Sequence, residues 1–144
     1  ENYVQEFLEK KNQLEHLEIE WHLIGPLQSN KVSRVVGVAD YIHSVDSLKL
    51  AQKINSSAAE KNIIQKVLLQ INIANEDSKS GLSTNDFLRE KNEFFKLKNI
   101  QVCGFMTMPP LANSAQDSQK HFKALKEIQL RVKSEYDFVN ELSM

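Results

Sequence analysis

Polar residues gather in a few short turns of this 144-residue sequence, and the densest of these turns runs from Gly25 to Lys31. Ser29 and Asn30 could cap a helix there, and the free N–H groups at a helix N-terminus favour anions. The turn indicates either a contact with an anion or a partner or, more simply, a capped turn with a solvated lysine. It does not follow the Gly-x4-Gly-Lys-Ser/Thr order of a phosphate-binding loop, and the sequence contains no Gly-x-Gly-x-x-Gly dinucleotide motif.

Two histidines, His22 and His43, lie in short apolar segments that are typical of strands. Each could donate a proton, stack on a ring or bind a metal ion, although a histidine within a strand is more often a half-buried, hydrogen-bonded residue. The sequence contains no His-Glu-x-x-His motif or carboxylate cluster with ligand spacing, so it predicts no metal site. The single cysteine, Cys103, excludes an internal disulfide framework, and its apolar surroundings predict a buried, unreactive thiol.

Two further side chains could contact a ligand. Met106 ends an apolar segment, where its thioether could pack against a flat ligand ring or, as is more common, fill the core. Lys79 could receive an anion or react with a carbonyl group if it were desolvated. Because Glu76 and Asp77 lie beside Lys79, the sequence favours an ordinary charged lysine.

Short apolar runs alternate with amphipathic segments along the chain. The expected helices are residues 3–17, a segment after Ser29, one after Asp46, one after Ser83 and one from Ser114; the expected strands are residues 21–24, 41–45, 66–73, 100–106 and 138–144. Asp46 is the expected N-cap of its helix, and Ser83 with Asp86 resembles a capping box. Strands separated by helices indicate parallel pairing and an α/β fold.

Two architectures fit this order of elements. The pattern alone favours a small doubly wound sheet, but it also fits part of an eight-stranded (β/α)8 barrel, which normally needs about 250 residues. In both architectures ligands bind at the carboxyl ends of the strands. Those ends are where polar residues concentrate in this sequence, at residues 22–30, 43–46 and 72–79 and at Thr107.

The composition limits the class of protein. Lys and Arg number 18 against 19 Asp and Glu, and a net charge of −1 gives no basic footprint for general nucleic-acid binding. No apolar run approaches the ~20 residues that a membrane helix needs. The sequence has no signal peptide, so we expect a cytoplasmic protein, and its length predicts one domain.

Residues 21–31 (WHLIGPLQSNK) resemble one particular family, the pyridoxal-phosphate homeostasis proteins, also called the YggS or proline-synthetase-associated family. Other segments agree with the family in the same order: residues 1–6 (ENYVQE), 43–46 (HSVD), 70–73 (QINI) with Glu76, Lys79 and Gly81, 104–109 (GFMTMP) and 142–144 (LSM). The resemblance covers the whole chain. Leu23 is a minor departure, because Phe or Met is usual at that position.

The resemblance implies a parallel (β/α)8 barrel that binds pyridoxal 5′-phosphate (PLP), like the N-terminal domain of alanine racemase. The chain would be an incomplete barrel, from the end of the family's second strand to its seventh, so residues 1–144 would form a single incomplete domain. The lysine that forms the Schiff base with PLP would precede Glu1, and the glycine-rich phosphate-binding segment would follow Met144. The residues expected near the cofactor are Asn2, His22, Ser44, Asn72, Met106 and Ser143.

The function implied by the resemblance is PLP (vitamin B6) homeostasis by a non-catalytic carrier. The alternatives are a PLP-dependent enzyme with an alanine-racemase-like fold, or an interaction module that binds no ligand. PLP is the expected partner, and neither a nucleic acid nor a membrane is. The intact protein is expected to be a monomer, whereas the chain by itself could self-associate through exposed strand edges.

Overall fold

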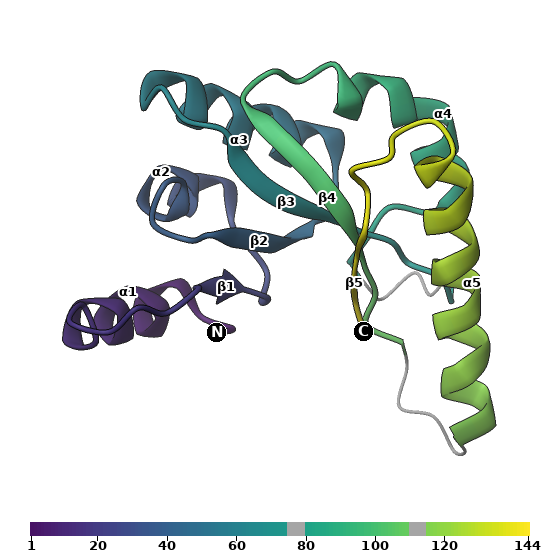
Figure 1. The fold of residues 1–144 in the computed structure, drawn as a ribbon, viewed down its shortest axis with the longest axis horizontal. Coiled ribbons are helices and arrows are strands. Elements are labelled where there is room, and N and C mark those ends of the chain that lie inside the picture. Colours follow the sequence, from purple (N-terminus) through teal and green to yellow (C-terminus); the bar gives the residue numbers. More distant parts are fainter. Residues whose placement is uncertain (75–79, 110–114) are drawn as a thin grey trace.

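The computed structural model describes residues 1–74, 80–109 and 115–144 (Figure 1). Its helices are α1 (Val4–Gln13), the 3-10 helix η1 (Ser29–Lys31), α2 (Val32–Val35), α3 (Leu48–Glu60), α4 (Thr84–Phe95) and α5 (Ala115–Lys133). Its strands are β1 (His22–Leu23), β2 (Tyr41–Val45), β3 (Gln65–Gln70), β4 (Ile100–Met106) and β5 (Glu141–Ser143). The predicted alternation of helices and strands is confirmed, although β3 ends earlier and β5 begins later than the sequence indicated.

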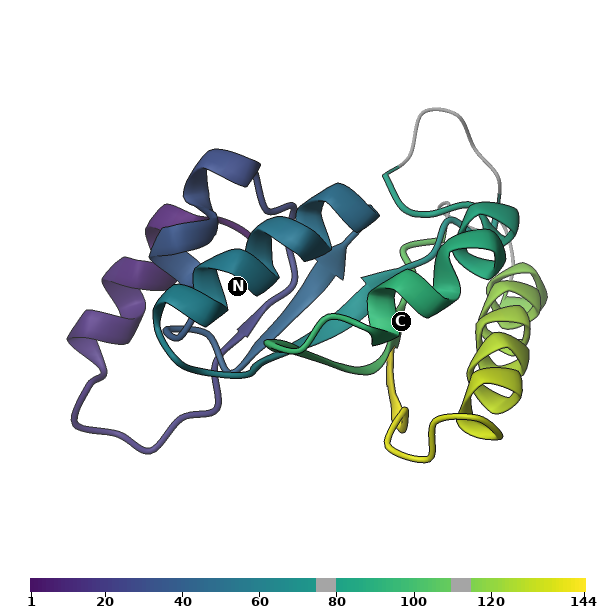
Figure 2. The same cartoon turned by 90° about the horizontal axis from the view of Figure 1, so that it is seen from above.

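All five strands pair in parallel in the order β1-β2-β3-β4-β5. A doubly wound sheet reverses its strand order at a switch point, whereas a barrel places each new strand beside the last. The order does not reverse among the strands that the structure describes, so the doubly wound sheet favoured by the pattern is wrong. When successive strands are added on the same side, right-handed crossovers place the connecting helices on one face of the sheet. Figures 1 and 2 show the helices on the outside of a curved sheet. The fold is therefore a segment of a (β/α) barrel.

The pairing of the sheet extends beyond β1 to the first residue of the chain. The N-terminal amine of Glu1 donates to the His22 carbonyl at 2.8 Å, and the Glu1 carbonyl accepts from the Ile24 N–H at 2.9 Å. This alternation is the pattern of a parallel ladder. Gly25 permits the close approach, because a Cβ at that position would lie 1.9 Å from the carbonyl oxygen of Asn2.

The side chains of each strand alternate between two faces of the sheet. On β2, Ile42 is fully buried, whereas Tyr41 and His43 are half-buried on the opposite face. Leu23 and Val67 pair in register with Ile42 and are also fully buried. The apolar core therefore lies between the sheet and its helices, and the face of Tyr41 and His43 is the inner face of the barrel.

The helix expected after Ser29 is much shorter than predicted. The chain forms η1 and then only the 4 residues of α2 before Gly37, whose φ of 77° ends the helical run. Ser29 and Asn30 lie inside η1, and neither N-cap residue, Gln28 for η1 or Lys31 for α2, makes a side-chain cap within the described part of the chain. The predicted cap by Ser29 or Asn30 is wrong, because the turn brings both residues into the helical backbone.

The N-cap of α3 is Ser47, not Asp46 as predicted. Ser47 Oγ accepts from the Leu50 N–H at 3.3 Å and donates to Asp46 Oδ1 at 3.2 Å. The extended backbone of Ser47, with φ −158° and ψ 153°, sets its hydroxyl over the first turn. Asp46 therefore supports the cap from the preceding position.

Replacing Ser47 with alanine is expected to lower the free energy of unfolding by about 1 kcal/mol, because a helix N–H loses its partner. Denaturant unfolding measures the loss. Asp46→Ala is expected to cost less, and Ser56→Ala should cost almost nothing, because that exposed hydroxyl bonds to the Gln52 carbonyl of its own helix. A greater loss for Asp46→Ala than for Ser47→Ala would restore the cap predicted from the sequence.

The N-cap predicted for α4 at Ser83 is confirmed, and Asp86 is its partner, but the Asp86 carboxylate contacts the Ser83 hydroxyl, whereas a full capping box uses the Ser83 N–H. Ser83 Oγ accepts from the Asp86 N–H at 3.0 Å and donates to the Asp86 carboxylate at 2.7 Å. The helix buries Phe87 and Phe94 completely and leaves Leu88 51% exposed.

Among the residues that the structure describes, no helix is both long and apolar enough to cross a membrane.

Candidate functional site

Four side chains on the inner face form one continuous hydrogen-bonded chain. Glu20 Oε1 lies 2.9 Å from His22 Nε2, and His22 Nδ1 lies 2.8 Å from His43 Nε2. His43 Nδ1 in turn lies 2.9 Å from Ser143 Oγ. Glu20 precedes β1, the two histidines lie on β1 and β2, and Ser143 ends β5. The chain therefore crosses the inside of the curved sheet and reaches the carboxyl end of its last strand.

Strand register and ring stacking align the two histidines. His22 pairs with Tyr41 across the parallel ladder, and His43 follows Tyr41 by two positions on β2, so all three rings share the inner face. The His22 ring stacks on Tyr41, with 4.7 Å between centroids and 10° between planes. It meets His43 edge-on at 5.0 Å and 68°. Tyr41 therefore holds the His22 ring where its Nδ1 faces His43.

The hydrogen-bonded chain lines a cavity of about 140 Å³. The lining residues are Glu20, His22, Tyr41, His43, Leu68, Glu141, Leu142 and Ser143. The carboxylates of Glu20 and Glu141 lie at the amino ends of their strands, whereas Ser143 lies at a carboxyl end. An anionic ligand group is therefore repelled from the end of the cavity that Glu20 and Glu141 line, and it is better received at the carboxyl edge, beside Ser143.

Burial, as the largest cause, and the nearby His22 together lower the pKa of His43 to about 4. His43 is therefore neutral near neutral pH, with one ring nitrogen that donates and one that accepts. The hydrogen-bonded chain consequently has a direction, which is set by the nitrogen of His43 that carries the proton.

His43 is expected to make the folded protein more stable as the pH rises from about 4 to about 6.5. In this window the unfolded chain binds a proton at His43 that the folded protein does not, so stability is present above about pH 6.5 and is lost as the pH falls. Because the imidazole is only partly buried, the expected loss is no more than about 2 kcal/mol. Unfolding at a series of pH values measures it. His43→Gln should reduce the slope, the exposed His16→Gln should not, and an unchanged slope in His43→Gln would contradict the assignment.

Several of the residues predicted near a cofactor line up along the carboxyl edge of the sheet. Met106 ends β4, is 3% exposed and pairs in register with Ser143. Asn72 follows the end of β3 and is half-buried. Asn2 is exposed, and its backbone packs against Gly25 beyond the end of β1. His22 does not itself lie at this edge, and it is connected to the edge by the hydrogen bonds that join it to His43 and His43 to Ser143.

Ser44 differs from the other predicted residues, because the fold itself uses its hydroxyl. Ser44 Oγ donates to the Gly25 carbonyl at 2.6 Å, and the residue is 2% exposed. Its side chain lies on the face of β2 opposite to His43. The bond ties the end of β2 to the turn after β1, and a cofactor contact by Ser44 stays a prediction.

Glu20, Tyr41 and His43 were not among the residues predicted near the cofactor, although His43 was a candidate proton donor, stacking group or metal ligand. The alternation Tyr41-x-His43 in a predicted strand indicates a shared face and was the signal that could have added His43. No local pattern marks Glu20, because its role depends on where the His22 ring lies in the fold. Lys79, for which the sequence left an anion or carbonyl contact open, lies outside the described residues.

Cys103 is buried, as predicted. Burial raises the pKa of its thiol, although the nearby Lys66 acts in the opposite direction, so the thiol stays protonated.

In residues 1–74, 80–109 and 115–144, no group of three or more His, Cys, Asp or Glu side chains could hold a metal ion. The facing nitrogens of His22 and His43 bond to each other instead of converging on one point.

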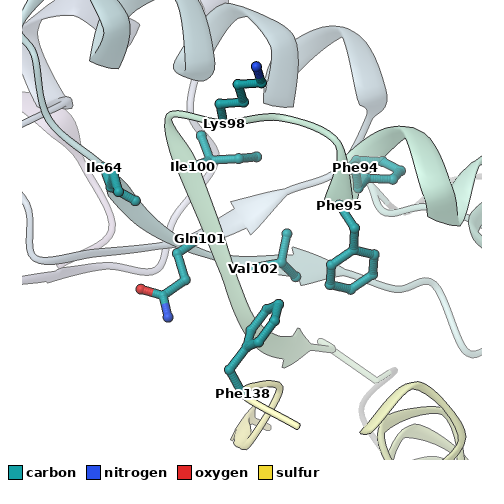
Figure 3. A pocket seen from close by; sticks show the side chains of 8 residues that line it. All are labelled: Ile64, Phe94, Phe95, Lys98, Ile100, Gln101, Val102 and Phe138. Carbon is teal, nitrogen blue, oxygen red and sulfur yellow. The ribbon is translucent and has the colours of Figure 1, made fainter. Parts of the chain in front are cut away.

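A second cavity, of about 340 Å³, lies around the amino half of β4 (Figure 3). Its lining residues are Ile64, Phe94, Phe95, Lys98, Ile100, Gln101, Val102 and Phe138. The lining is apolar apart from Lys98 and Gln101, and none of these side chains is a carboxylic acid. Because it lies at the amino ends of the strands, away from the carboxyl edge, we assign the candidate site to the smaller cavity.

Comparison with known proteins finds one family over nearly the whole chain. The family model of the alanine racemase N-terminal domain matches residues 2–144. The pyridoxal phosphate homeostasis protein of Aquifex aeolicus is 40% identical over 138 residues, which cover 95% of this chain and 60% of the relative. That of Synechocystis sp. is 38% identical over 146 residues, which cover 100% of this chain and 67% of the relative. The chain thus spans 60% to 67% of the length of these curated relatives.

Solved structures agree with the barrel. PipY of Synechococcus elongatus without PLP matches with a TM-score of 0.92 and 33% identity, over 99% of this chain and 68% of PipY. The structure of PipY with PLP bound matches with a TM-score of 0.89 and 32% identity, over the same shares of the two chains, 99% and 68%. An alanine racemase of Clostridium difficile matches with a TM-score of 0.77 over 98% of this chain and 38% of the racemase, and at 17% identity it supports the fold alone.

Proposed function

The chain belongs to the pyridoxal phosphate homeostasis protein family, and from that membership we propose that it forms part of a PLP site in a non-catalytic carrier of PLP. The proposal includes the domain organisation: residues 1–144 form a single barrel domain that is incomplete. The observation that carries the proposal is the hydrogen-bonded chain that ends in the Ser143 hydroxyl at the carboxyl edge. Similarity to PipY, which has been solved with PLP bound, supports the same ligand.

The donor set at this edge suits a ligand with a flat ring and an anionic group. Met106 brings a thioether that can pack on a ring, and it pairs in register with Ser143, which brings a hydroxyl. The carboxylates of Glu20 and Glu141 lie at the opposite ends of the strands and keep an anionic group at the carboxyl edge. When bound, PLP supplies an aldehyde that reacts with amines, and a carrier limits that reactivity.

The predicted residues take separate parts in this proposal. Met106 supports the ring, and Ser143 and Asn72 offer hydrogen bonds. His22 orients Ser143 through His43. Ser44 and Asn2 shape the edge around Gly25, through the Ser44–Gly25 hydrogen bond and the backbone contact of Asn2.

Saturable binding of PLP by the native protein, expressed from its complete gene, tests the proposal. Equilibrium dialysis is expected to show that Ser143→Ala weakens binding about tenfold, the worth of a hydrogen bond to a charged group. Ser134→Ala is the matched control, because its exposed hydroxyl bonds to the Arg131 carbonyl at the end of α5. Absence of saturable PLP binding would overturn the proposed function.

The alternative is a PLP-dependent enzyme with the same barrel. The names of the relatives favour a carrier, since they describe homeostasis and not a reaction. Racemisation of D- and L-alanine by the native protein, compared with PLP alone, separates the two functions. Turnover above the PLP-only rate would favour the enzyme.

A cytoplasmic location and a monomeric native state complete the proposal. Disulfides persist mainly in oxidising compartments. Cys103 is buried and free, in a chain that has only 1 cysteine, and this state suits a reducing compartment.

The chain of residues 1–144 by itself is expected to self-associate. Within the described residues β5 pairs only with β4, so its other edge offers free N–H and C=O groups to a second chain. Light scattering should give a mass above 16.5 kDa that rises with concentration. A monomer that melts cooperatively would contradict this expectation.

A further inference from the structure

The chain of Glu20, His22, His43 and Ser143 can hold its protons in two ways. We propose that Glu20, His22 and His43 form a relay, in which protonation of His22 decides whether the Ser143 hydroxyl donates to His43 or to a ligand. The relay stands on three consecutive contacts of 2.9, 2.8 and 2.9 Å. It rests on the proposed function only for the identity of the ligand, PLP.

When His22 is neutral, one arrangement satisfies all three contacts. The Glu20 carboxylate only accepts, so His22 Nε2 carries the proton and His22 Nδ1 is an acceptor. His43 Nε2 must therefore donate to His22, which leaves His43 Nδ1 as the acceptor for the Ser143 hydroxyl. In this state Ser143 presents only oxygen lone pairs to the carboxyl edge.

One additional proton, taken from water, reverses the direction of the chain. His22 then carries protons on both ring nitrogens, and its Nδ1 donates to His43 Nε2. His43 remains neutral, because its single proton now lies on Nδ1 and donates to Ser143 Oγ. Ser143 keeps its hydroxyl proton, which turns away from His43 toward the carboxyl edge, so the relay gains one proton in total and the exchanges involve only N–H and O–H bonds.

The surroundings keep the added charge on His22. The His22 side chain is 36% exposed and contacts the Glu20 carboxylate, whereas burial lowers the pKa of His43 to about 4. The other titratable or charged groups near the relay are the amine of Glu1, Tyr41 on β2, Lys66 on β3, Cys103 on β4 and Glu141 on β5. Lys66 contacts Tyr41, with its Nζ 4.9 Å from the ring centroid. Glu20 is therefore the carboxylate that stabilises the protonated ring.

The relay couples ligand binding to pH. A Ser143 hydroxyl that is free to donate binds an anionic acceptor better than one that already donates to His43. The contribution of Ser143 to the affinity for an anionic ligand is therefore expected to be about fivefold greater when His22 is protonated, the worth of one net hydrogen bond. By linkage, the ligand in turn favours the protonated His22.

Nitrogen NMR of the native protein, labelled with 15N and free of ligand, tests the relay directly. As the pH is lowered, His43 is expected to change from the Nε2–H to the Nδ1–H tautomer in the same step in which His22 becomes doubly protonated. Glu20→Gln replaces a carboxylate that only accepts with an amide that can also donate, so it should mix the two tautomers of His43 before His22 is protonated, whereas His16→Gln should leave them unchanged. If His43 keeps one tautomer when His22 is doubly protonated, the relay is overturned.

PLP affinity gives the second readout. The ratio of the dissociation constants of Ser143→Ala and native protein cancels the titration of PLP itself. It is expected to be about fivefold greater at a pH at which the NMR spectrum shows His22 doubly protonated than at a pH at which it shows His22 neutral. Ratios that are equal at the two pH values would overturn the coupling. If no variant bound PLP, the proposed function would fail, and the tautomer measurement would still decide the relay.

Discussion

Replacing Phe87 with alanine is expected to lower the free energy of unfolding by about 3–5 kcal/mol. Phe87 is fully buried on α4 and meets Phe105 of β4 edge-to-face, with 5.2 Å between ring centroids and 77° between ring planes. Removing its ring leaves a cavity between helix and sheet that the rigid strand cannot collapse to fill. Denaturant unfolding followed by circular dichroism measures the loss.

The neighbouring residue provides a matched control. Leu88 lies one position further along α4 and is 51% exposed, so Leu88→Ala is expected to change stability by less than about 0.5 kcal/mol. Similar losses for Phe87→Ala and Leu88→Ala would mean that α4 is not packed on β4 by the Phe87 face.

Gly104→Ala is expected to cost about 3 kcal/mol and to separate β5 from β4. A Cβ on Gly104 would lie 1.9 Å from the carbonyl oxygen of Glu141 and 2.6 Å from its carbonyl carbon. Both are backbone atoms, so no side chain can move aside, and the loss is expected at the upper end of about 1–3 kcal/mol for overpacking. Because β5 carries Ser143, the variant should also lose PLP affinity if the proposed function holds.

Two measurements test the effect of Gly104→Ala. The melting temperature should fall by about 10 °C, and the Thr107 amide, which donates to the Ser143 carbonyl at 3.0 Å, should lose its protection from hydrogen exchange. Gln101→Ala, at an exposed position on the same strand, is the control. A Thr107 amide that keeps full protection in Gly104→Ala would show that β5 tolerates the added methyl group.

The sequence predicted the elements well where local signals are strong. The apolar runs of β3 and β4 and the N-cap at Ser83 can be recognised from the sequence, because each depends on residues close together in the chain. The caps at Ser29 and Asp46 failed, since a one-residue shift in where the backbone becomes helical decides which side chain caps it. The order of the strands in the sheet could not be predicted either, because no local sequence pattern determines which strands become neighbours.

For the site, the sequence by itself determined which residues could act: two histidines in strands, a methionine and a serine at strand ends, and the motifs that resemble one family. Only the tertiary structure decided which of them meet. His22 and His43 are 21 positions apart and His43 and Ser143 are 100 positions apart, so their contacts depend on parallel register and on the curvature of the sheet. Alternation along a strand fixes the face of each side chain locally, but contact between side chains of distant strands comes only from the curvature of the sheet.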